Sequence, residues 1–286
     1  MTLHSFLCIG VVAGLGLSGV DDLQDPGENN IRGTAISVDI YDNIFVLDSE
    51  SSTLRIYSKE RALLHEVGGQ GWEQDRFDRP AGVWARNGID VYVADYGNHR
   101  IQRYDRNLSF VSSLSTRDNR NRDEQFGYPS DVSLSRTGDL FICDTENSRI
   151  VKLNTLNGVS VPFGGFGAGQ GRLLQPSRAQ VGPKDNVYVL DEGRVLVFDN
   201  FGNYVQDLSP GLITDPTALY ADEEGVAVLD SAVIFFFGPD DRPGPAVQIE
   251  PIVAPHNVRI RSVAVSNGVL YLLSEAGLYT VPDPRK

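Results

Sequence analysis

One short pattern recurs six times along this chain of 286 residues, and its regular spacing is the feature that most restricts the fold. Each copy contains a short apolar run that ends in aspartate, or in serine in the last copy. Successive closing residues lie 39 to 49 residues apart: Asp48, Asp95, Asp144, Asp191, Asp230 and Ser274. A period of this length, made of short strands and turns, is typical of β-propellers and similar arrays.

The second copy shows how each unit divides into strands. Residues 83–85 and 91–93 are runs of β-branched and aromatic residues, too short for helices. The pair Asn87-Gly88 joins them and tolerates the positive φ of a tight hairpin. A third run follows at 100–104 and a fourth at 108–111. Four antiparallel strands make one blade, so the sequence predicts an all-β, six-bladed β-propeller of four-stranded antiparallel blades.

The order of residues in the second and third copies resembles a known repeat family. Copy two reads Pro80-Ala81-Gly82-Val83, then Val93-Ala94-Asp95, then Asn98-His99-Arg100-Ile101, and copy three keeps this order from Pro129 to Ile150. This order is similar to the NHL repeat, and the resemblance extends over about residues 31–281. It implies a six-bladed propeller of NHL type. The fold hosts lyases, hydrolases, RNA-binding proteins and sensors, so it implies no single function.

The N-terminal segment has two interpretations. Residues 6–17 form an apolar run of the length of a secretory signal sequence, too short for a membrane span, and small residues follow at Ser18-Gly19. We expect a signal peptide at 1–19, a single propeller domain without a transmembrane span at 20–286, and a periplasmic or secreted protein. In the alternative, residues within 15–23 supply a fourth strand to the last copy, which contains only three runs, and the protein is cytoplasmic.

The chain is acidic, with a formal net charge of −13. Binding to nucleic acid depends on Lys and Arg side chains that neutralise phosphates, so this charge argues against a nucleic-acid partner. It favours a protein or a small molecule as the partner.

No motif has the spacing of a catalytic or metal centre. The histidines are scattered and no two have the spacing of zinc ligands: His4, His65, His99 and His256. Family lyases that cleave hydroxyglycine hold zinc with three histidines around the channel mouth, and the resemblance does not extend to such a set here. The chain lacks a Gly-x-Ser-x-Gly elbow, and Cys143 lies in an apolar strand before Asp144. We expect no catalytic residue, no metal and no cofactor.

The candidate binding residues break the repeat or lie in its turns. The second position after the repeat proline is Asp131 in copy three and Arg178 in copy four. Because adjacent blades are neighbours, these two side chains form either an inter-blade ion pair or a pair that contacts a ligand. The turns after the second strands lie on the same propeller face. The predicted ligand-binding residues are Trp72, Tyr96, Asn98, His99, Asp131, Asn147 and Arg178, with Glu146 on the same rim.

The repeated pairs Asp95–Arg100 and Asp144–Arg149 are predicted to stabilise the fold, because near-identical residues in several blades cannot all be catalytic. Loss of such a turn pair should cost about 1 kcal/mol. These patterns favour a non-enzymatic binding or scaffold propeller that recognises a protein or small-molecule partner. The alternative is a lyase or hydrolase with a metal-assisted site at the channel mouth.

Overall fold

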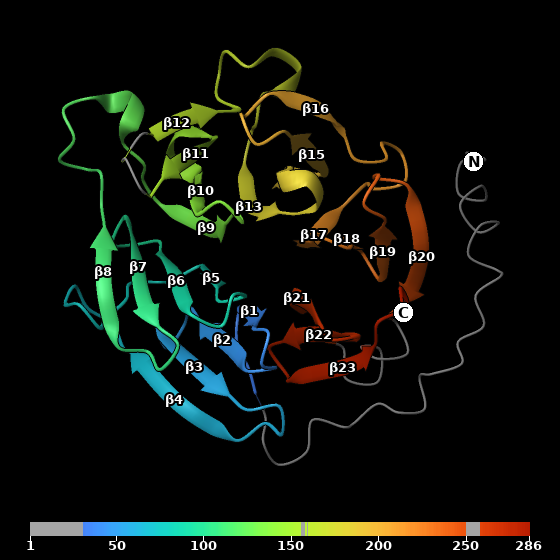
Figure 1. Cartoon of the computed structure of the whole chain (residues 1–286), viewed down its shortest axis with the longest axis horizontal. Helices are drawn as coiled ribbons and strands as arrows, with labels where there is room; N and C mark the ends of the chain where they lie inside the picture. The colour runs from blue at the N-terminus through green and yellow to red at the C-terminus, as the bar shows by residue number, and fades with distance from the viewer. Residues whose placement is uncertain (1–30, 156–157, 159, 250–257) are drawn as a thin grey trace, which may run out of the picture.

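The computed structural model describes residues 31–155, 158, 160–249 and 258–286. Its strands form six separate antiparallel sheets, which Figure 1 shows as blades around a central axis. Within each sheet the strands follow one another in chain order from the axis outwards. The predicted all-β, six-bladed propeller is therefore confirmed.

The first three blades contain β1 (Ala35–Val38), β2 (Ile44–Asp48), β3 (Thr53–Tyr57) and β4 (Leu63–Gly68); β5 (Gly82–Trp84), β6 (Asp90–Asp95), β7 (Arg100–Asp105) and β8 (Phe110–Leu114); and β9 (Pro129–Leu134), β10 (Asp139–Asp144), β11 (Arg149–Asn154) and β12 (Ser160–Phe163). The last three contain β13 (Pro176–Val181), β14 (Val187–Asp191), β15 (Arg194–Phe198) and β16 (Tyr204–Asp207); β17 (Pro216–Asp222), β18 (Gly225–Asp230), β19 (Val233–Phe237) and β20 (Pro243–Gln248); and β21 (Ile260–Ser266), β22 (Val269–Ser274) and β23 (Leu278–Pro282). Short 3-10 helices lie in connections: η2 (Arg122–Glu124), η3 (Thr145–Asn147), η4 (Gly169–Gly171) and η5 (Pro183–Asp185).

Strand pairing determines which loops share a face of the propeller. In the second blade, β5 pairs antiparallel with β6, and the connecting hairpin turns at Gly88, whose φ of +69° suits glycine. β6 then returns and ends at Asp95, opposite Arg100 at the start of β7. The turns between second and third strands therefore lie on one face, with the linkers into the first strands; we call it the turn face. The opposite face carries the hairpins between first and second strands; we call it the hairpin face.

The apolar core lies in wedges between neighbouring blades. Ile36, Val83 and Val132 come from three first strands, each twelve residues before the closing aspartate of its copy, and all are buried, as this repeated position predicts. Val132 packs in one cluster with Ala94 and Ile101 of the preceding blade. Because every wedge needs side chains from two blades, each blade is stabilised by its neighbours.

The last blade differs from the other five, because three of its strands are described, β21 to β23. This agrees with the three apolar runs of the last sequence copy. The signal peptide predicted at 1–19 and the closing strand predicted within 15–23 both lie outside the described residues. No helix in the described part of the chain is long and apolar enough to cross a membrane.

Some strand boundaries differ from those predicted. β8 begins at Phe110 and not at residue 108, because Leu108 has a φ of +63° and its N–H closes a turn on the carbonyl of Asp105. In the third and fourth blades the first strand already begins at the repeat proline, where Pro129 lies opposite Asp144 and Pro176 opposite Asp191. The closing aspartate is thus the partner of the residue that starts each of these blades.

Candidate functional site

The closing aspartates hold the linkers between blades on the turn face. In the second blade, Asp95 is fully buried and accepts a hydrogen bond of 2.8 Å from the backbone N–H of Asp78 in the linker. Its other oxygen accepts from the side chains of Asn98 and Arg100, each at 2.8 Å. A buried carboxylate needs such donors to remain charged. The same carboxylate therefore holds the linker and the turn together.

Arg100 completes this arrangement from the outer side. Its remaining N–H groups donate to the backbone carbonyls of Trp72, Glu73 and Arg76 at 2.8–3.0 Å. We call the closing Asp, the turn Asn and the Arg together the linker clamp. This geometry fits the structural role predicted for the Asp–Arg pairs, with the preceding linker as the segment that is held.

The third blade has the same clamp. Asp144 accepts from the backbone N–H of Gly127 at 3.0 Å, from Asn147 at 2.8 Å and from Arg149 at 2.9 Å. Arg149 in turn donates to the linker carbonyl of Gln125 at 2.6 Å. Two blades thus repeat one set of contacts, as expected for a feature of the fold.

Two predicted binding residues, Asn98 and Asn147, therefore belong to the clamps. Asn98 is buried, and its amide also donates to the carbonyl of Gly71 at 2.8 Å. Trp72, in contrast, leaves its side chain 70% exposed while Arg100 holds its carbonyl. Trp72 and Asn147 are both exposed, and Trp72 is the large aromatic residue of the two.

Between the second and third blades, the turn face carries what we call the aromatic cluster: Tyr96, His99, Tyr128, Arg79 and Arg117. The ring centroid of Tyr128 lies 5.1 Å from that of Tyr96 and 4.0 Å from that of His99. Arg79 lies over the Tyr96 ring at 5.7 Å, and Arg117 over the Tyr128 ring at 5.9 Å. Rings in tilted and edge-to-face contact, and cations over their faces, attract one another and fix one another's position.

Arg117 ties the cluster to the third blade through Glu146, at 3.2 Å. The structure therefore brings together Tyr96, His99 and Glu146, which the sequence placed on one rim. It adds three residues that the sequence analysis missed: Tyr128, Arg79 and Arg117.

The backbone of the aromatic cluster is strained at three residues. The φ angles of Arg79, His99 and Tyr128 are +49°, +51° and +47°. Bulky residues seldom adopt this region, and the residue before a proline, as Arg79 and Tyr128 are, normally favours extended backbone. Such conformations cost of order 1–3 kcal/mol each and concentrate at binding and catalytic sites.

His99 is held as a neutral imidazole. Its Nδ1 accepts from the backbone N–H of Tyr128 at 3.1 Å and from the guanidinium of Arg117 at 2.7 Å. Burial and Arg117 lower the pKa of His99 below its ordinary value of 6.5, and Arg79 acts in the same direction, whereas Glu146 and Asp78 oppose them. A nitrogen that accepts two hydrogen bonds has no place for a second proton, so the geometry and the pKa agree.

Asp131 and Arg178 line the channel instead of forming an exposed rim. Asp131 is 2% exposed and accepts from the backbone N–H of Ala179 at 3.0 Å and from Gln180 at 2.8 Å. Burial raises the pKa of the Asp131 carboxyl, and the nearby charge of Arg178 partly offsets this effect. Arg178 donates to the carbonyl of Ser130 at 3.1 Å and forms no ion pair with any described residue. Of the two predicted alternatives, the inter-blade ion pair is not formed, and separate hydrogen bonds connect the same two blades.

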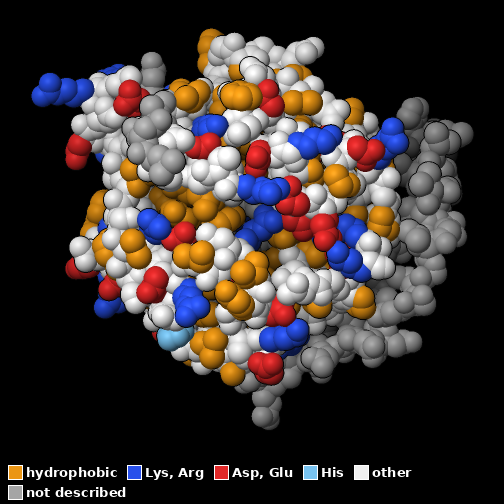
Figure 2. Space-filling model, viewed as in Figure 1, with side chains coloured by type: hydrophobic (Ala, Val, Ile, Leu, Met, Phe, Trp, Pro, Cys, Tyr) orange, Lys and Arg blue, Asp and Glu red, His pale blue; other side chains and the backbone are white. Residues whose placement is uncertain are grey.

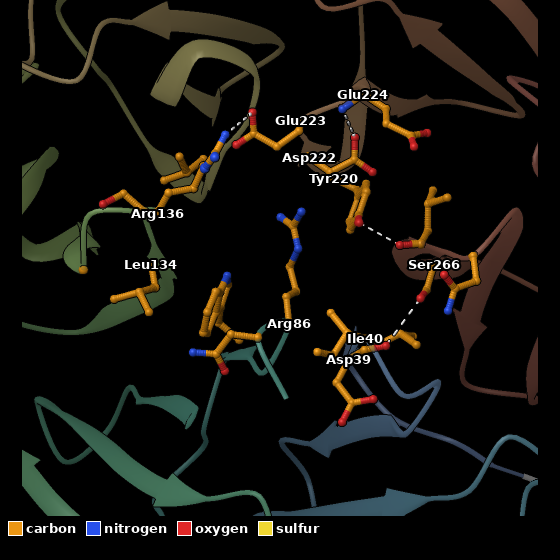
Figure 3. Close-up of a pocket in the computed structure, with 18 residues that line it drawn as sticks. Asp39, Ile40, Arg86, Leu134, Arg136, Tyr220, Asp222, Glu223, Glu224 and Ser266 are labelled. Carbon is orange, nitrogen blue, oxygen red and sulfur yellow. Dashed lines mark hydrogen bonds and ion pairs between the residues drawn. The ribbon is translucent and has the colours of Figure 1, made fainter. Parts of the chain in front are cut away.

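A cavity of about 530 Å³ lies at the hairpin-face end of the channel, lined by residues of all six blades. Figure 2 shows side chains of both charges gathered around the centre of the face in view. In the close-up of Figure 3, Arg86 points into the middle of the cavity, with Tyr220 and Asp222 on the blade across from it. Towards the turn face the channel narrows to a void of about 20 Å³ that both Arg86 and Arg178 line. This void has room for about one water molecule.

The described residues contain no group of three or more His, Cys, Asp or Glu side chains that could hold a metal ion. His65 lies on β4 and His99 in the turn before β7, while His4 and His256 lie outside the described residues. Cys143 is buried, and burial raises its pKa to about 12, so its thiol is protonated at neutral pH.

The missed residues have little signal in the sequence. Arg79 and Tyr128 directly precede repeat prolines, and the linkers bring this position to the turn face. A comparison of the residue types that precede the proline in each copy could have singled them out. Arg117 lies in a polar loop whose sequence has no counterpart in the other copies. Arg86 lies in the Arg86-Asn87-Gly88 turn, where only the hairpin was predicted.

Comparison with known proteins gives one matching family model, the NHL repeat, at residues 77–104 and 126–153. These ranges fall within the second and third units, which carry the complete clamps. Brain tumor protein of Drosophila melanogaster is 31% identical over 150 residues, which cover 51% of this chain and 14% of that protein. NHL repeat-containing protein 2 of Homo sapiens is 31% identical over 138 residues, covering 40% of this chain and 19% of that protein.

A third relative carries the name of an enzyme. The "Probable peptidyl-alpha-hydroxyglycine alpha-amidating lyase" of Caenorhabditis elegans is 28% identical over 165 residues, covering 57% of this chain and 44% of that protein. This chain thus covers less than half the length of each of these three relatives. Among solved structures, inactive virginiamycin B lyase from Staphylococcus aureus with quinupristin matches with a TM-score of 0.60 at 10% identity, covering 92% of this chain and 88% of that one. At this identity the match shows a shared fold.

Proposed function

Because the protein is a six-bladed β-propeller that carries NHL repeats, we propose that it is a non-enzymatic binding or scaffold module whose partner is a protein held on the turn face of blades two and three. The observation that carries this proposal is the aromatic cluster between these blades, with strained backbone at three of its members. The propeller fold itself supports a binding role.

The types of residue in this region support a protein partner. Tyr, Trp and Arg dominate the energetics of protein interfaces, and the turn face presents all three. Rings that already pack against one another and a backbone that is already fixed lose little conformational entropy when a partner binds. The exposed indole of Trp72 lies on a linker that Arg100 holds against the same blade. The two clamps would then act as the rigid support for a contact surface.

The proposal is tested with a partner captured from the source cells and identified by mass spectrometry. Its dissociation constant is then measured by calorimetry for wild type, Trp72→Ala and Tyr96→Ala. Loss of an interface hot spot weakens binding by about tenfold or more, and we expect this for both variants. Phe201→Ala is the matched control, since Phe201 is also an exposed aromatic residue, 77% exposed, and lies in the turn before β16 in the fourth blade. Equal affinities for all four proteins would contradict this placement.

The second candidate is a lyase or hydrolase with a metal-assisted site at the channel mouth. The amidating lyase among the relatives is the observation that favours it. Incubation with a peptide that ends in α-hydroxyglycine, with and without added Zn²⁺, tests this candidate directly. Metal-dependent formation of the amidated peptide would replace the binding proposal by the enzymatic one.

We also propose that residues 1–19 are a signal peptide, that residues 20–286 form one domain, and that the protein is exported. The apolar run at 6–17 and the small residues after it support this. Mass spectrometry of protein expressed in an exporting host should show cleavage near residues 18–20. An intact Met1 on protein recovered from the medium or periplasm would contradict it.

A further inference from the structure

The hairpin-face cavity has the size of a small-molecule site and a lining of mixed character. Its volume of about 530 Å³ lies within the range of ligand pockets. Trp84 and Tyr220 supply aromatic walls, and aliphatic side chains such as Val38 and Val181 complete the apolar part. Charged side chains surround these walls (Figure 3). A charged side chain of this lining that lacks a partner of opposite charge would be the point where a charged ligand binds.

The acidic side chains of the wall are paired with cations outside or at the rim of the cavity. Asp222 pairs with Arg285 at 3.3 Å, Glu223 with Arg136 at 3.5 Å and Glu224 with Lys286 at 2.6 Å. Each of these carboxylates has a cationic neighbour, but Arg285 also pairs with Asp283 at 3.0 Å, so this group keeps one negative charge without its own cation among the described residues.

Asp39, the remaining acid of the wall, is satisfied within its own turn. It is buried and accepts from the backbone N–H groups of Tyr41 and Asn43 at 2.9 Å and 2.8 Å, and from the Asn43 amide at 2.9 Å. Its carboxylate is thus occupied by neutral donors and does not face the centre of the cavity as a free acceptor.

Arg86 is a charged side chain of the lining that has no charged partner among the described residues. Its guanidinium donates to the backbone carbonyl of Ala221 and stacks on the ring of Tyr220, 4.9 Å from the centroid. It forms no ion pair with a described residue. Tyr220 itself donates to the carbonyl of Val265 at 2.6 Å, and burial raises its pKa to about 12, so it carries no negative charge at neutral pH. A guanidinium with five N–H donors therefore points into the cavity with most of them free of protein acceptors.

The charge below Arg86 has the same sign. Arg178 lies on the other side of the narrow void and is likewise without an ion pair among the described residues. Asp131 lines the same void, and its buried carboxyl offsets at most the charge of Arg178, so the floor of the cavity keeps the positive charge of Arg86. In a half-enclosed space of low dielectric constant, an unpaired cation attracts an anion more strongly than it would in water.

We propose that this cavity binds a small organic anion, whose carboxylate or phosphate group pairs with the guanidinium of Arg86 and whose apolar body packs against Trp84 and Tyr220. The fork of a guanidinium matches two oxygens of either group. This site lies on the face opposite the proposed protein surface and is independent of it.

The two tryptophans of the chain allow a direct test, because they lie on opposite faces of the propeller. Trp84 lines the cavity, and Trp72 is exposed on the turn face. Full-length protein labelled with 5-fluorotryptophan should give two fluorine resonances, assigned with Trp72→Phe. We expect benzoate or phenyl phosphate to shift the Trp84 resonance and to leave the Trp72 resonance in place. Comparison of these two probes distinguishes a carboxylate site from a phosphate site.

Two arginine variants provide the matched comparison. Arg86→Gln should weaken the effect of the anion on the Trp84 resonance at least tenfold. Arg136→Gln removes an arginine of the same cavity that is paired with Glu223 and 73% exposed, and should leave the titration unchanged. Arg86→Lys, which retains the charge without the fork, should fall between wild type and Arg86→Gln. Thermal unfolding of each variant without ligand establishes that it is folded.

Three results would overturn the proposal. The first is the absence of a Trp84 shift with both anions at about 10 mM, where a ligand with a millimolar dissociation constant is mostly bound. The second is an equal shift with uncharged benzamide, since the apolar walls alone would then explain binding. The third is an equal loss of binding in Arg136→Gln and Arg86→Gln.

Discussion

Blades two and three differ from blades five and six in how the chain is held on the turn face. Asp95 and Asp144 each bind a linker N–H, a turn asparagine and an arginine that also reaches the linker carbonyls. Asp230 binds the linker N–H groups of Thr214 and Asp215 and the hydroxyl of Ser231, without an arginine.

In the sixth blade, Ser274 bonds only within its own turn among the described residues: it accepts from the N–H of Ala276 at 3.0 Å and from that of Gly277 at 2.9 Å. In the fourth blade, Asp191 accepts from the linker N–H groups of Leu174 and Gln175 at 2.8 and 2.7 Å, so contact between the closing aspartate and the linker is common to blades two to five. The arginine is an addition in blades two to four. The aromatic cluster lies between the two blades with complete clamps. The positive φ angles of Arg79, His99 and Tyr128 therefore lie in the part of the turn face whose linkers are held by complete clamps.

Removal of a closing aspartate should give the largest difference between the two regions. Asp95→Ala leaves Arg100 and a linker N–H without their acceptor and should lower the free energy of unfolding by about 4 kcal/mol. Asp230→Ala frees N–H groups of Thr214 and Asp215, which lie at exposed residues, and should cost about 1 kcal/mol. Urea unfolding of both variants measures this difference. If both variants lose the same free energy of unfolding, the asparagine and arginine of the clamp do not increase the contribution of the aspartate.

Removal of the clamp arginine should follow in size. Arg100→Ala and Arg149→Ala should each cost about 3 kcal/mol, because each arginine is 12–13% exposed and pairs with a fully buried carboxylate. This exceeds the value of about 1 kcal/mol expected for an exposed turn pair. Urea unfolding measures the cost, and Arg100→Lys, which cannot reach three carbonyls, should recover only part of it. A variant that lost partner binding at unchanged stability would refute the structural role.

Core substitutions should lower the free energy of unfolding by the same amount in the clamped and the unclamped blades. Val132 in the third blade and Val263 in the sixth are both buried in inter-blade wedges, with exposures of 0% and 3%. Val132→Ala and Val263→Ala should each cost about 2 kcal/mol, from lost burial and a partly collapsed cavity. Thermal unfolding of the two variants should agree closely. A much smaller loss for Val263→Ala would mean that the sixth blade is loosely packed and not merely unclamped.

The smallest expected effect is a change of stability with pH, which arises from His99 in the clamped region. The pKa of His99 is lowered in the folded protein, so the unfolded chain binds more protons as the pH falls through about 6.5. The stability that neutral His99 contributes is present above this pH and decreases below it. His99→Gln should remove this part of the acid dependence. The measurement is the difference in Tm between wild type and variant from pH 7.5 to pH 5.5, and a constant difference would contradict the lowered pKa.

The sequence was sufficient for the architecture because each blade repeats its own local signals. The closing aspartates, the Asn87-Gly88 hairpin and the repeat prolines all depend on contacts within one blade or with its own linker. The buried positions Ile36, Val83 and Val132 each lie twelve residues before the closing aspartate of their copy, so the repeat itself predicts them.

The site was less accessible to sequence analysis because it depends on which residues of different blades meet. Asn98 has a binding-type side chain but is occupied by Asp95 and a linker carbonyl. Asp131 and Arg178 were correctly placed on neighbouring blades, but their direction towards the channel depends on the register of β9 and β13. Tyr128 becomes important only through its ring contacts with Tyr96 and His99, which lie about thirty residues earlier in the chain.

The unpaired guanidinium of Arg86 lies in a molecule with a formal net charge of −13, and this has a kinetic consequence. At about 0.01 M ionic strength the Debye length is about 30 Å, so an approaching anion is repelled by the charge of the whole molecule. At about 0.15 M it is about 8 Å, and the anion responds mainly to the arginine. Association of an anionic ligand should therefore become faster as salt is added, the reverse of electrostatic steering. Stopped-flow measurements across this range would show how strongly the acidic surface slows the access of an anion to Arg86.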